Sequence, residues 1–257
     1  MPTAINDGVE LRYETGGDGP TVAFCNEVGY GAWLWGWQHG ALAGPYEALV
    51  ADLRGTGRSD APDGPYDVAT LVADLEAVLA DHGARRVHLV GAGLGGMVAL
   101  EHAREHGRAR SVTLLGSALS GDAVDGGMLD VMGGRGPESL SPCFSEEFFR
   151  SQREVIAGIE KWRDEEDAGE SAREAQTAAM LGYDCPAPYE IDPPALVCHG
   201  TDDPVVGPDA GRDLATALPG ARFESLPGRH LAFVESSRVA NDAVAAFVEE
   251  HAGRGEA

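Results

Sequence analysis

The stretch from Gly91 to Gly96 constrains the fold of this chain more than any other feature of its sequence. It reads Gly-Ala-Gly-Leu-Gly-Gly, follows the apolar run Arg86–Val90 directly and opens the helical pattern Met97–His106. Glycines between a strand and a helix predict a sharp turn with close packing of the two elements. Two kinds of site have this layout: a phosphate-binding turn, G-x-G-x-x-G, and a nucleophile elbow, G-x-S-x-G, with Gly93 where the serine belongs.

Short apolar runs alternate with helical stretches along most of the chain. This pattern predicts the α/β class, with a mainly parallel central sheet flanked by helices on both faces. We expect the first two strands to form a hairpin across a glycine-rich turn. The expected strands are Val9–Glu14, Thr21–Cys25, Glu47–Asp52, Arg86–Val90, Ser111–Leu115, Ala195–Cys198 and Arg222–Leu226, and the expected helices are Asp67–His82, Met97–His106 and Val239–His251.

The alternation stops between about Gly121 and Tyr189, where glycine-rich loops, a phenylalanine cluster and an acidic helical stretch occur. We therefore expect residues 1–120 and 190–257 to form one core domain and residues 121–189 to form an inserted, mainly helical cap. A chain of 257 residues with 43% hydrophobic content is large enough to bury such a core without a second independent domain.

The net charge of −23 excludes several classes of partner. Nucleic acid and anionic membrane surfaces would be repelled, so we predict neither as a partner. An acidic chain with a single lysine, Lys161, is also typical of halophilic proteins, whose self-repulsion salt screens. No basic and apolar leader and no run of about 20 apolar residues is present, which predicts a cytoplasmic protein. The four cysteines form no C-x-x-C pair, so we expect free, mostly buried thiols.

The phosphate-binding interpretation of the glycine turn lacks its usual partner. A dinucleotide fold places this turn after its first strand and an acidic residue about 20 positions later, at the end of the next strand. Here several strands precede the turn, and the next strand ends in Leu114-Leu115-Gly116-Ser117. A dinucleotide-dependent oxidoreductase therefore stays the least favoured alternative, and no cofactor is predicted.

The nucleophile-elbow interpretation gains support from distant positions. An Asp202-Asp203 pair follows the strand that ends at Cys198, and His230 follows the last strand, which gives the chain order of elbow, acid and histidine. The segment Asp52–Ser59 reads Asp-Leu-Arg-Gly-Thr-Gly-Arg-Ser. On these residues the chain resembles the α/β-hydrolase fold superfamily. The tetrapeptide Asn-Glu-Val-Gly at 26–29, with Trp35 and Gly64-Pro65-Tyr66, resembles the 3-oxoadipate enol-lactonase branch, which has serine where Glu27 stands here.

The resemblance implies roles for individual residues and hydrolysis of a small-molecule carboxylic ester or lactone. His230 is the expected base, and Asp203, favoured over Asp202 by its spacing from the strand end, is the expected orienting acid. The backbone N–H groups of Val28 and Leu94 are the expected oxyanion hole. Oligomeric state does not follow from the sequence.

Gly93 has no side chain and cannot attack a substrate, which leaves three alternatives. The chain is a non-catalytic small-molecule-binding protein, or His230 and Asp203 activate a water molecule, or another group replaces the nucleophile. Glu27 and Ser117 are the candidates for the last alternative. Against them stand plainer interpretations: a solvated loop carboxylate for Glu27 and a hydroxyl bonded to backbone for Ser117.

The pattern His102-Ala-Arg-Glu-His106 matches the zinc motif H-x-x-E-H. Because it lies on the helix after the elbow, away from the expected active site, and no third ligand can be placed, we predict no metal. We expect His199 to be a structural residue. Trp33, Trp35 and Trp37 suit a substrate entrance or packing under the cap equally well.

Overall fold

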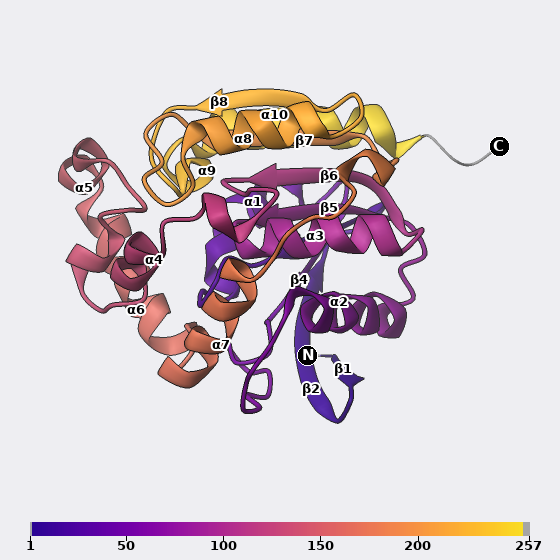
Figure 1. Cartoon of the computed structure of the whole chain (residues 1–257), viewed down its shortest axis with the longest axis horizontal. Coiled ribbons are helices and arrows are strands. Elements are labelled where there is room, and N and C mark those ends of the chain that lie inside the picture. The colour runs from indigo at the N-terminus through magenta and orange to yellow at the C-terminus, as the bar shows by residue number, and fades with distance from the viewer. Residues whose placement is uncertain (1, 254–257) are drawn as a thin grey trace.

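An eight-stranded sheet forms the centre of the molecule (Figure 1), and the computed structural model describes residues 2–253. The strands lie in the order β1-β2-β4-β3-β5-β6-β7-β8. β2 runs antiparallel to β1 and β4, and the remaining neighbours are parallel, as predicted. The bounds are β1 Thr3–Asn6, β2 Val9–Gly16, β3 Thr21–Cys25, β4 Glu47–Ala51, β5 Val87–Ala92, β6 Ala109–Leu115, β7 Ala195–Gly200 and β8 Arg222–Leu226.

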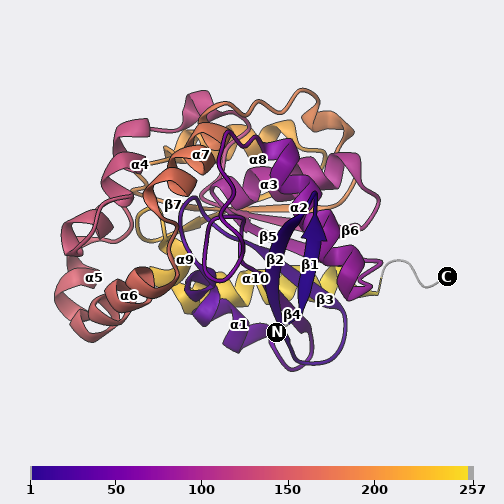
Figure 2. The same ribbon diagram turned by 90° about the horizontal axis from the view of Figure 1, so that it is seen from below.

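Helices cover both faces of this sheet, as Figure 2 shows: α2, α3 and α8 lie on one side, and α1 and α10 on the other. Their apolar faces and the buried strands form one continuous core. The bounds are α1 Gly36–Leu42, α2 Val68–His82, α3 Leu94–Glu105, α4 Gly126–Met132, α5 Glu146–Ser151, α6 Arg153–Glu166, α7 Glu170–Leu181, α8 Pro208–Ala217, α9 Ala232–Glu235 and α10 Ser237–Ala252. Short 3-10 turns lie at Ala32–Trp35, Gly121–Ala123, Pro137–Leu140 and Pro188–Glu190.

The predicted hairpin between the first two expected strands is wrong. β2 pairs with β1 on one side and with β4 on the other, and β3 lies between β4 and β5. The hairpin partner is instead β1, which the sequence analysis missed because it has only four residues. A glycine-rich turn allows the chain to reverse, but the pairing of the following strand depends on the whole sheet.

The glycine turn joins β5 to α3 as predicted, and its glycines let three backbones approach closely. A Cβ added to Gly91 would lie 2.2 Å from the carbonyl oxygen of Gly95, and one added to Gly95 would lie 2.0 Å from that of Cys25. Gly93 itself has φ +44, in the left-handed region that favours glycine. The helix begins at Leu94, three residues earlier than expected, because the turn is tight enough to start it at once.

Residues 121–189, which we call the cap segment, connect β6 to β7 and contain α4, α5, α6 and α7. Both views place α4, α5 and α6 together at one end of the molecule (Figures 1 and 2). Within residues 2–253, no helix is both long enough and apolar enough to cross a bilayer.

Candidate active site

Four loops that follow strands bring the predicted site residues together. Glu27 follows β3, Gly93 follows β5, Asp203 follows β7 and His230 follows β8. Because these strands belong to the parallel part of one sheet, their carboxyl ends meet at the same edge. The edge is covered, and the side chains of Glu27, Asp203 and His230 are all buried.

His230 and Asp203 form the pair that the chain order predicts. Nδ1 of His230 lies 2.9 Å from Oδ2 and 3.1 Å from Oδ1 of Asp203. Oδ1 also accepts hydrogen bonds from the backbone N–H groups of Val205 and Val206, at 2.9 and 3.0 Å. The carboxylate is thus fixed by its own loop, and it orients the imidazole so that Nε2 faces the glycine turn.

Glu27 is the third member of this buried chain of charged groups. Its Oε2 lies 2.8 Å from Nε2 of His230, and its side chain has no exposed surface. The interpretation of Glu27 as a solvated loop carboxylate is therefore wrong. A carboxylate is tolerated at this depth because a histidine and two backbone donors surround it.

Both N–H groups expected to form the oxyanion hole donate to one atom, Oε1 of Glu27. The distances are 2.5 Å from the nitrogen of Val28 and 3.2 Å from that of Leu94. The two donors therefore converge on one oxygen atom, as the donors of an oxyanion hole must, and here that atom belongs to Glu27.

The two neighbouring carboxylates determine the charge of His230. Burial alone would lower the pKa of His230, but Asp203 and Glu27 outweigh burial and raise it to about 10. Burial would also raise the pKa of Asp203, and the facing imidazoles of His230 and His199 instead hold it well below its usual range. At neutral pH His230 is therefore an imidazolium that donates from both ring nitrogens.

Gly93 makes room for the Glu27 carboxylate. A Cβ added to Gly93 would lie 1.6 Å from Oε2 of Glu27, a separation at which two atoms cannot coexist. The volume that a serine side chain would fill thus holds a carboxylate oxygen supplied by another loop. The glycine at position 93 and the glutamate at position 27 are sterically complementary.

The other candidates for the site have structural surroundings. Ser117 is buried and donates to the carbonyl oxygen of Gly93 at 2.8 Å, which is its plainer interpretation. His199 lies 2.7 Å from the carbonyl oxygen of Val206 and 3.3 Å from Asp203, so it supports the acid loop. Asp202 is exposed and bonded to Thr201.

The tryptophans pack rather than line an entrance. Trp35 is fully buried and donates from its indole nitrogen to Asn26 at 2.7 Å, and Trp33 is buried as well. Trp37, the least buried of the three, lies edge-on to Trp162 of the cap segment. These contacts favour packing under the cap over a lined entrance.

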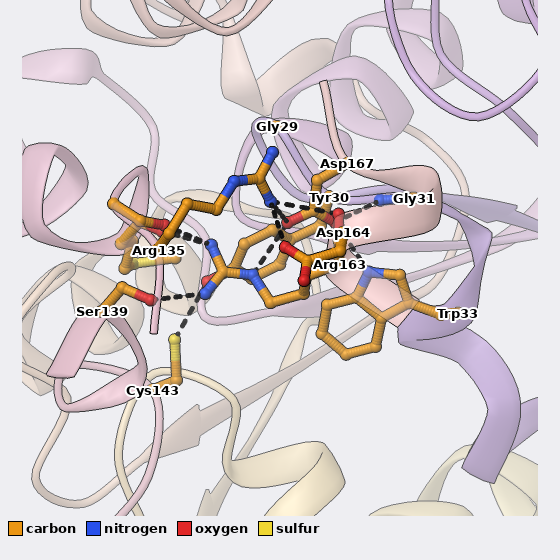
Figure 3. Close-up of polar contacts among 12 residues, drawn as sticks. Gly29, Tyr30, Gly31, Trp33, Arg135, Ser139, Cys143, Arg163, Asp164 and Asp167 are labelled. Carbon is orange, nitrogen blue, oxygen red and sulfur yellow. Dashed lines mark hydrogen bonds and ion pairs between the residues drawn. The ribbon is translucent and has the colours of Figure 1, made fainter. Parts of the chain in front are cut away.

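Figure 3 shows how the cap segment is tied to the loop after β3. Arg163 of α6 is buried, forms an ion pair with Asp167 at 2.8 Å and lies over the ring of Tyr30, with 4.9 Å between Cζ and the ring centroid. The hydroxyl of Tyr30 lies 3.2 Å from Sγ of Cys143, and the backbone carbonyl of Cys143 accepts from the N–H of Leu231, next to His230. One connected set of contacts therefore links the cap segment to the loop after β3, which carries Glu27, and to the loop after β8, which carries His230.

The cavity beside Val28, Gly29 and Tyr30 is small, with a volume of about 10 Å³. This is room for about one water molecule.

The comparisons with known proteins agree with this fold. The alpha/beta hydrolase family matches residues 24–247. The chain belongs to this family. The putative carbamate hydrolase RutD of Variovorax paradoxus is 31% identical over 93% of this chain and 96% of its own, and a non-heme chloroperoxidase of Kitasatospora aureofaciens is 30% identical over 86% and 88%. The enol-lactonase of Burkholderia xenovorans has a similar structure, with a TM-score of 0.83, 27% identity and coverage of 96% and 100%.

These relatives identify the chain as a hydrolase of the alpha/beta hydrolase family, with the fold that the sequence predicted. Sequence analysis named Glu27 as a candidate but did not predict that its carboxylate is buried against His230, because no motif describes a glutamate at this position. It missed one further residue. The third group beside His102 and His106 is Glu76, which comes from another helix.

Proposed function

We propose that this chain hydrolyses a small carboxylic ester or lactone at the buried Glu27–His230–Asp203 site. The way the Glu27 carboxylate is held carries the proposal: two backbone N–H groups bind Oε1, and His230 binds Oε2. The reacting group of an ester needs the same contacts, with its carbonyl oxygen on the N–H groups and a second oxygen at the histidine. The site therefore fits a carboxyl group, and Glu27 occupies it in the resting protein.

Substrate binding requires the Glu27 carboxylate to leave the two N–H groups. His230 gives its Nε2 proton to the departing Glu27 carboxylate and keeps Asp203 as its single carboxylate partner, so the neutral ring can accept a proton at Nε2. A water molecule in the space beside Gly93 attacks the carbonyl carbon and gives its proton to Nε2. The N–H groups of Val28 and Leu94 stabilise the oxyanion, and its collapse returns the proton to the leaving alkoxide, giving an acid and an alcohol.

The relatives support this choice of bond. One is named an enol-lactonase and another a putative carbamate hydrolase. Lactones and carbamates share a carbonyl carbon that bears a heteroatom leaving group. The burial of Glu27, Asp203 and His230 supports a small-molecule substrate rather than a polymer.

A panel of esters and lactones assayed with the parent and three variants tests the proposal. We expect His230→Ala and Asp203→Asn to lower kcat/KM at least about a hundredfold, the usual contribution of a positioned base. Glu27→Ala vacates the carboxyl site, so acetate should bind this variant and compete with substrate, and it should not affect the parent. Unchanged hydrolysis in both His230→Ala and Asp203→Asn would show that the proposal is wrong. No turnover by the parent or by Glu27→Ala would favour a binding protein.

The position of Oε1 favours a second candidate, in which Glu27 stays in place and attacks with Oε2. Its other oxygen already lies on both N–H groups, so attack on a saturated carbon of an epoxide breaks the bond from that carbon to the ring oxygen and gives an ester of Glu27 with its carbonyl on those N–H groups. The ring oxygen takes the Nε2 proton of His230 and becomes a hydroxyl, which leaves His230 neutral. Water activated by His230 then hydrolyses that ester at Cδ. A single turnover in ¹⁸O-labelled water separates the routes, because the label enters Glu27 in this one and the product acid in the first.

A further inference from the structure

We propose that Glu76, His102 and His106 form a binding site for a divalent transition-metal ion, and that Zn²⁺ is the ion that fits it best. The site joins α2, which carries Glu76, to the end of α3, which carries His102 and is followed directly by His106. His102 lies nine residues along α3 from Gly93, a rise of roughly 14 Å at 1.5 Å per residue. The site is thus separate from Glu27, Asp203 and His230.

The three side chains already converge. Nε2 of His102 lies 3.0 Å from Oε2 of Glu76, and Nδ1 of His106 lies 3.8 Å from the same oxygen. One ligand atom from each of the three lies within 4.8 Å of the others. Tetrahedral zinc with bonds of about 2.0–2.1 Å needs ligand atoms about 3.3 Å apart, so small side-chain shifts suffice.

The two histidine rings lie side by side at the C-terminal end of α3. His102 is in the last turn of the helix and His106 is the extended residue that ends it, and their ring centroids lie 4.6 Å apart. Nδ1 of His102 is buried and has no hydrogen-bond partner, so no other protein group fixes the ring proton. Metal binding at Nε2 leaves that proton on Nδ1.

Arg108 holds the carboxylate without blocking the site. Its Nη2 lies 2.6 Å from Oε1 of Glu76, and its Nη1 donates to the carbonyl oxygen of Ala84 at 2.6 Å. Nε of Arg108 lies 2.9 Å from each oxygen of Glu76. Oε2 must therefore give up its contact with Nε when it binds the metal. Arg108 stays bonded to Oε1 and so orients the Glu76 carboxylate toward the metal, as hydrogen-bond partners of metal-bound carboxylates do. The positive charge of Arg108 opposes a cation, and the net charge of −23 favours one.

The site leaves a position for water and a path for the ion. The side chains of Glu76 and His106 are 25% and 33% exposed, whereas His102 has no exposed surface. His106 also lines a surface groove of about 490 Å³, together with the acidic residues Glu105, Glu190 and Asp192 and the basic residues Arg86, Arg104 and Arg110. Three protein ligands and one water complete a tetrahedral site.

Titration of the chelator-treated full chain with Co²⁺, followed by Zn²⁺, tests the proposal. We expect one equivalent of Co²⁺ to give the intense visible bands of tetrahedral coordination, Zn²⁺ to displace it, and Zn²⁺ to raise the melting temperature. His106→Ala should weaken Zn²⁺ binding at least about tenfold, the smallest effect usual even for outer partners. Glu76→Gln should weaken it similarly, and circular dichroism verifies that both variants fold.

The chain supplies a matched control in His82. Its Nε2 lies 2.9 Å from Oε2 of Glu47, nearly the same contact, but no third ligand joins this pair within the described residues. His82→Ala should therefore leave Zn²⁺ affinity unchanged. Equal affinity in the parent, His106→Ala and His82→Ala, or octahedral Co²⁺ bands in the parent, would overturn the proposal.

Discussion

Two histidines of this molecule contact glutamates at nearly equal distances and yet carry different charges. His230 lies 2.8 Å from Glu27, and His102 lies 3.0 Å from Glu76. Burial acts to lower the pKa of both rings. The second carboxylate at His230, from Asp203, reverses the direction and raises its pKa to about 10, whereas the pKa of His102, beside a carboxylate shared with an arginine, falls to about 4.

The difference shows that a histidine–glutamate contact does not by itself define chemistry. An imidazolium between two carboxylates holds its proton until one partner leaves, which suits the proposed reaction, in which substrate displaces Glu27. A neutral imidazole keeps a lone pair that a metal ion can use. The number of facing charges, and not the contact distance, separates the two sites.

We expect the largest effect from alkaline pH, which should remove the charge of His230 and with it the difference from His102. The folded pKa of His230 is raised above the unfolded value of about 6.5, so its stabilisation is complete below that pH and is lost as the pH rises toward 10. The expected loss is about 1.4 kcal/mol per pH unit in this window. Urea denaturation of the parent and of Glu27→Gln from pH 6.5 to 10 measures it.

Glu27→Gln removes one of the two carboxylates that face His230. The decrease of the variant's free energy of unfolding with rising pH should therefore end at a lower pH than in the parent. Glu47→Gln removes the carboxylate of the half-buried His82 pair and is the control. If Glu27→Gln and the parent follow the same curve, Glu27 does not hold the proton on His230.

Restoring serine at position 93 should destabilise the protein by about 3 kcal/mol, the range of overpacking combined with a displaced buried charge. The new Cβ meets Oε2 of Glu27. Glu27→Ala combined with Gly93→Ser should recover most of this loss, so the two changes are strongly non-additive in a double-mutant cycle. Gly93→Ala, which adds the Cβ alone, distinguishes steric from polar effects. Additive free energies of unfolding would refute the steric coupling.

Arg108→Gln should have the smallest effect, a loss of about 0.5–1 kcal/mol, because this ion pair is partly exposed. Raising KCl should shrink the difference from the parent, since salt screens exposed charges more than buried ones. The buried His230–Asp203 pair serves as the comparison, because salt should leave its contribution to stability unchanged. A difference that persists unchanged in high salt would indicate that Arg108 acts through its bond to Ala84 instead.

Sequence analysis predicted the fold and the pair His230–Asp203 because both depend on chain order. Alternating strands and helices define a mainly parallel sheet, and loops after parallel strands must meet at one edge. The convergence of the Val28 and Leu94 N–H groups follows from the same topology and from the glycine turn. The order of β1 to β4 did not follow, because strand pairing depends on contacts between distant segments.

The position of the Glu27 carboxylate could not be predicted because it depends on an empty volume. Nothing in the local sequence around position 27 reports that Gly93 leaves space across the site. Glu76 escaped for a related reason: its place beside His102 depends on how α2 packs against α3, and helical periodicity gives the face of each helix but not their mutual register.

The fit between Gly93 and Glu27 has an evolutionary consequence. A chain that carries both residues does not gain a serine nucleophile by one substitution alone, because a side chain at position 93 meets the Glu27 carboxylate. Changing position 27 first leaves His230 with one of its two carboxylate partners. Each single substitution is expected to lower stability, so selection for a stable fold favours keeping the two residues together.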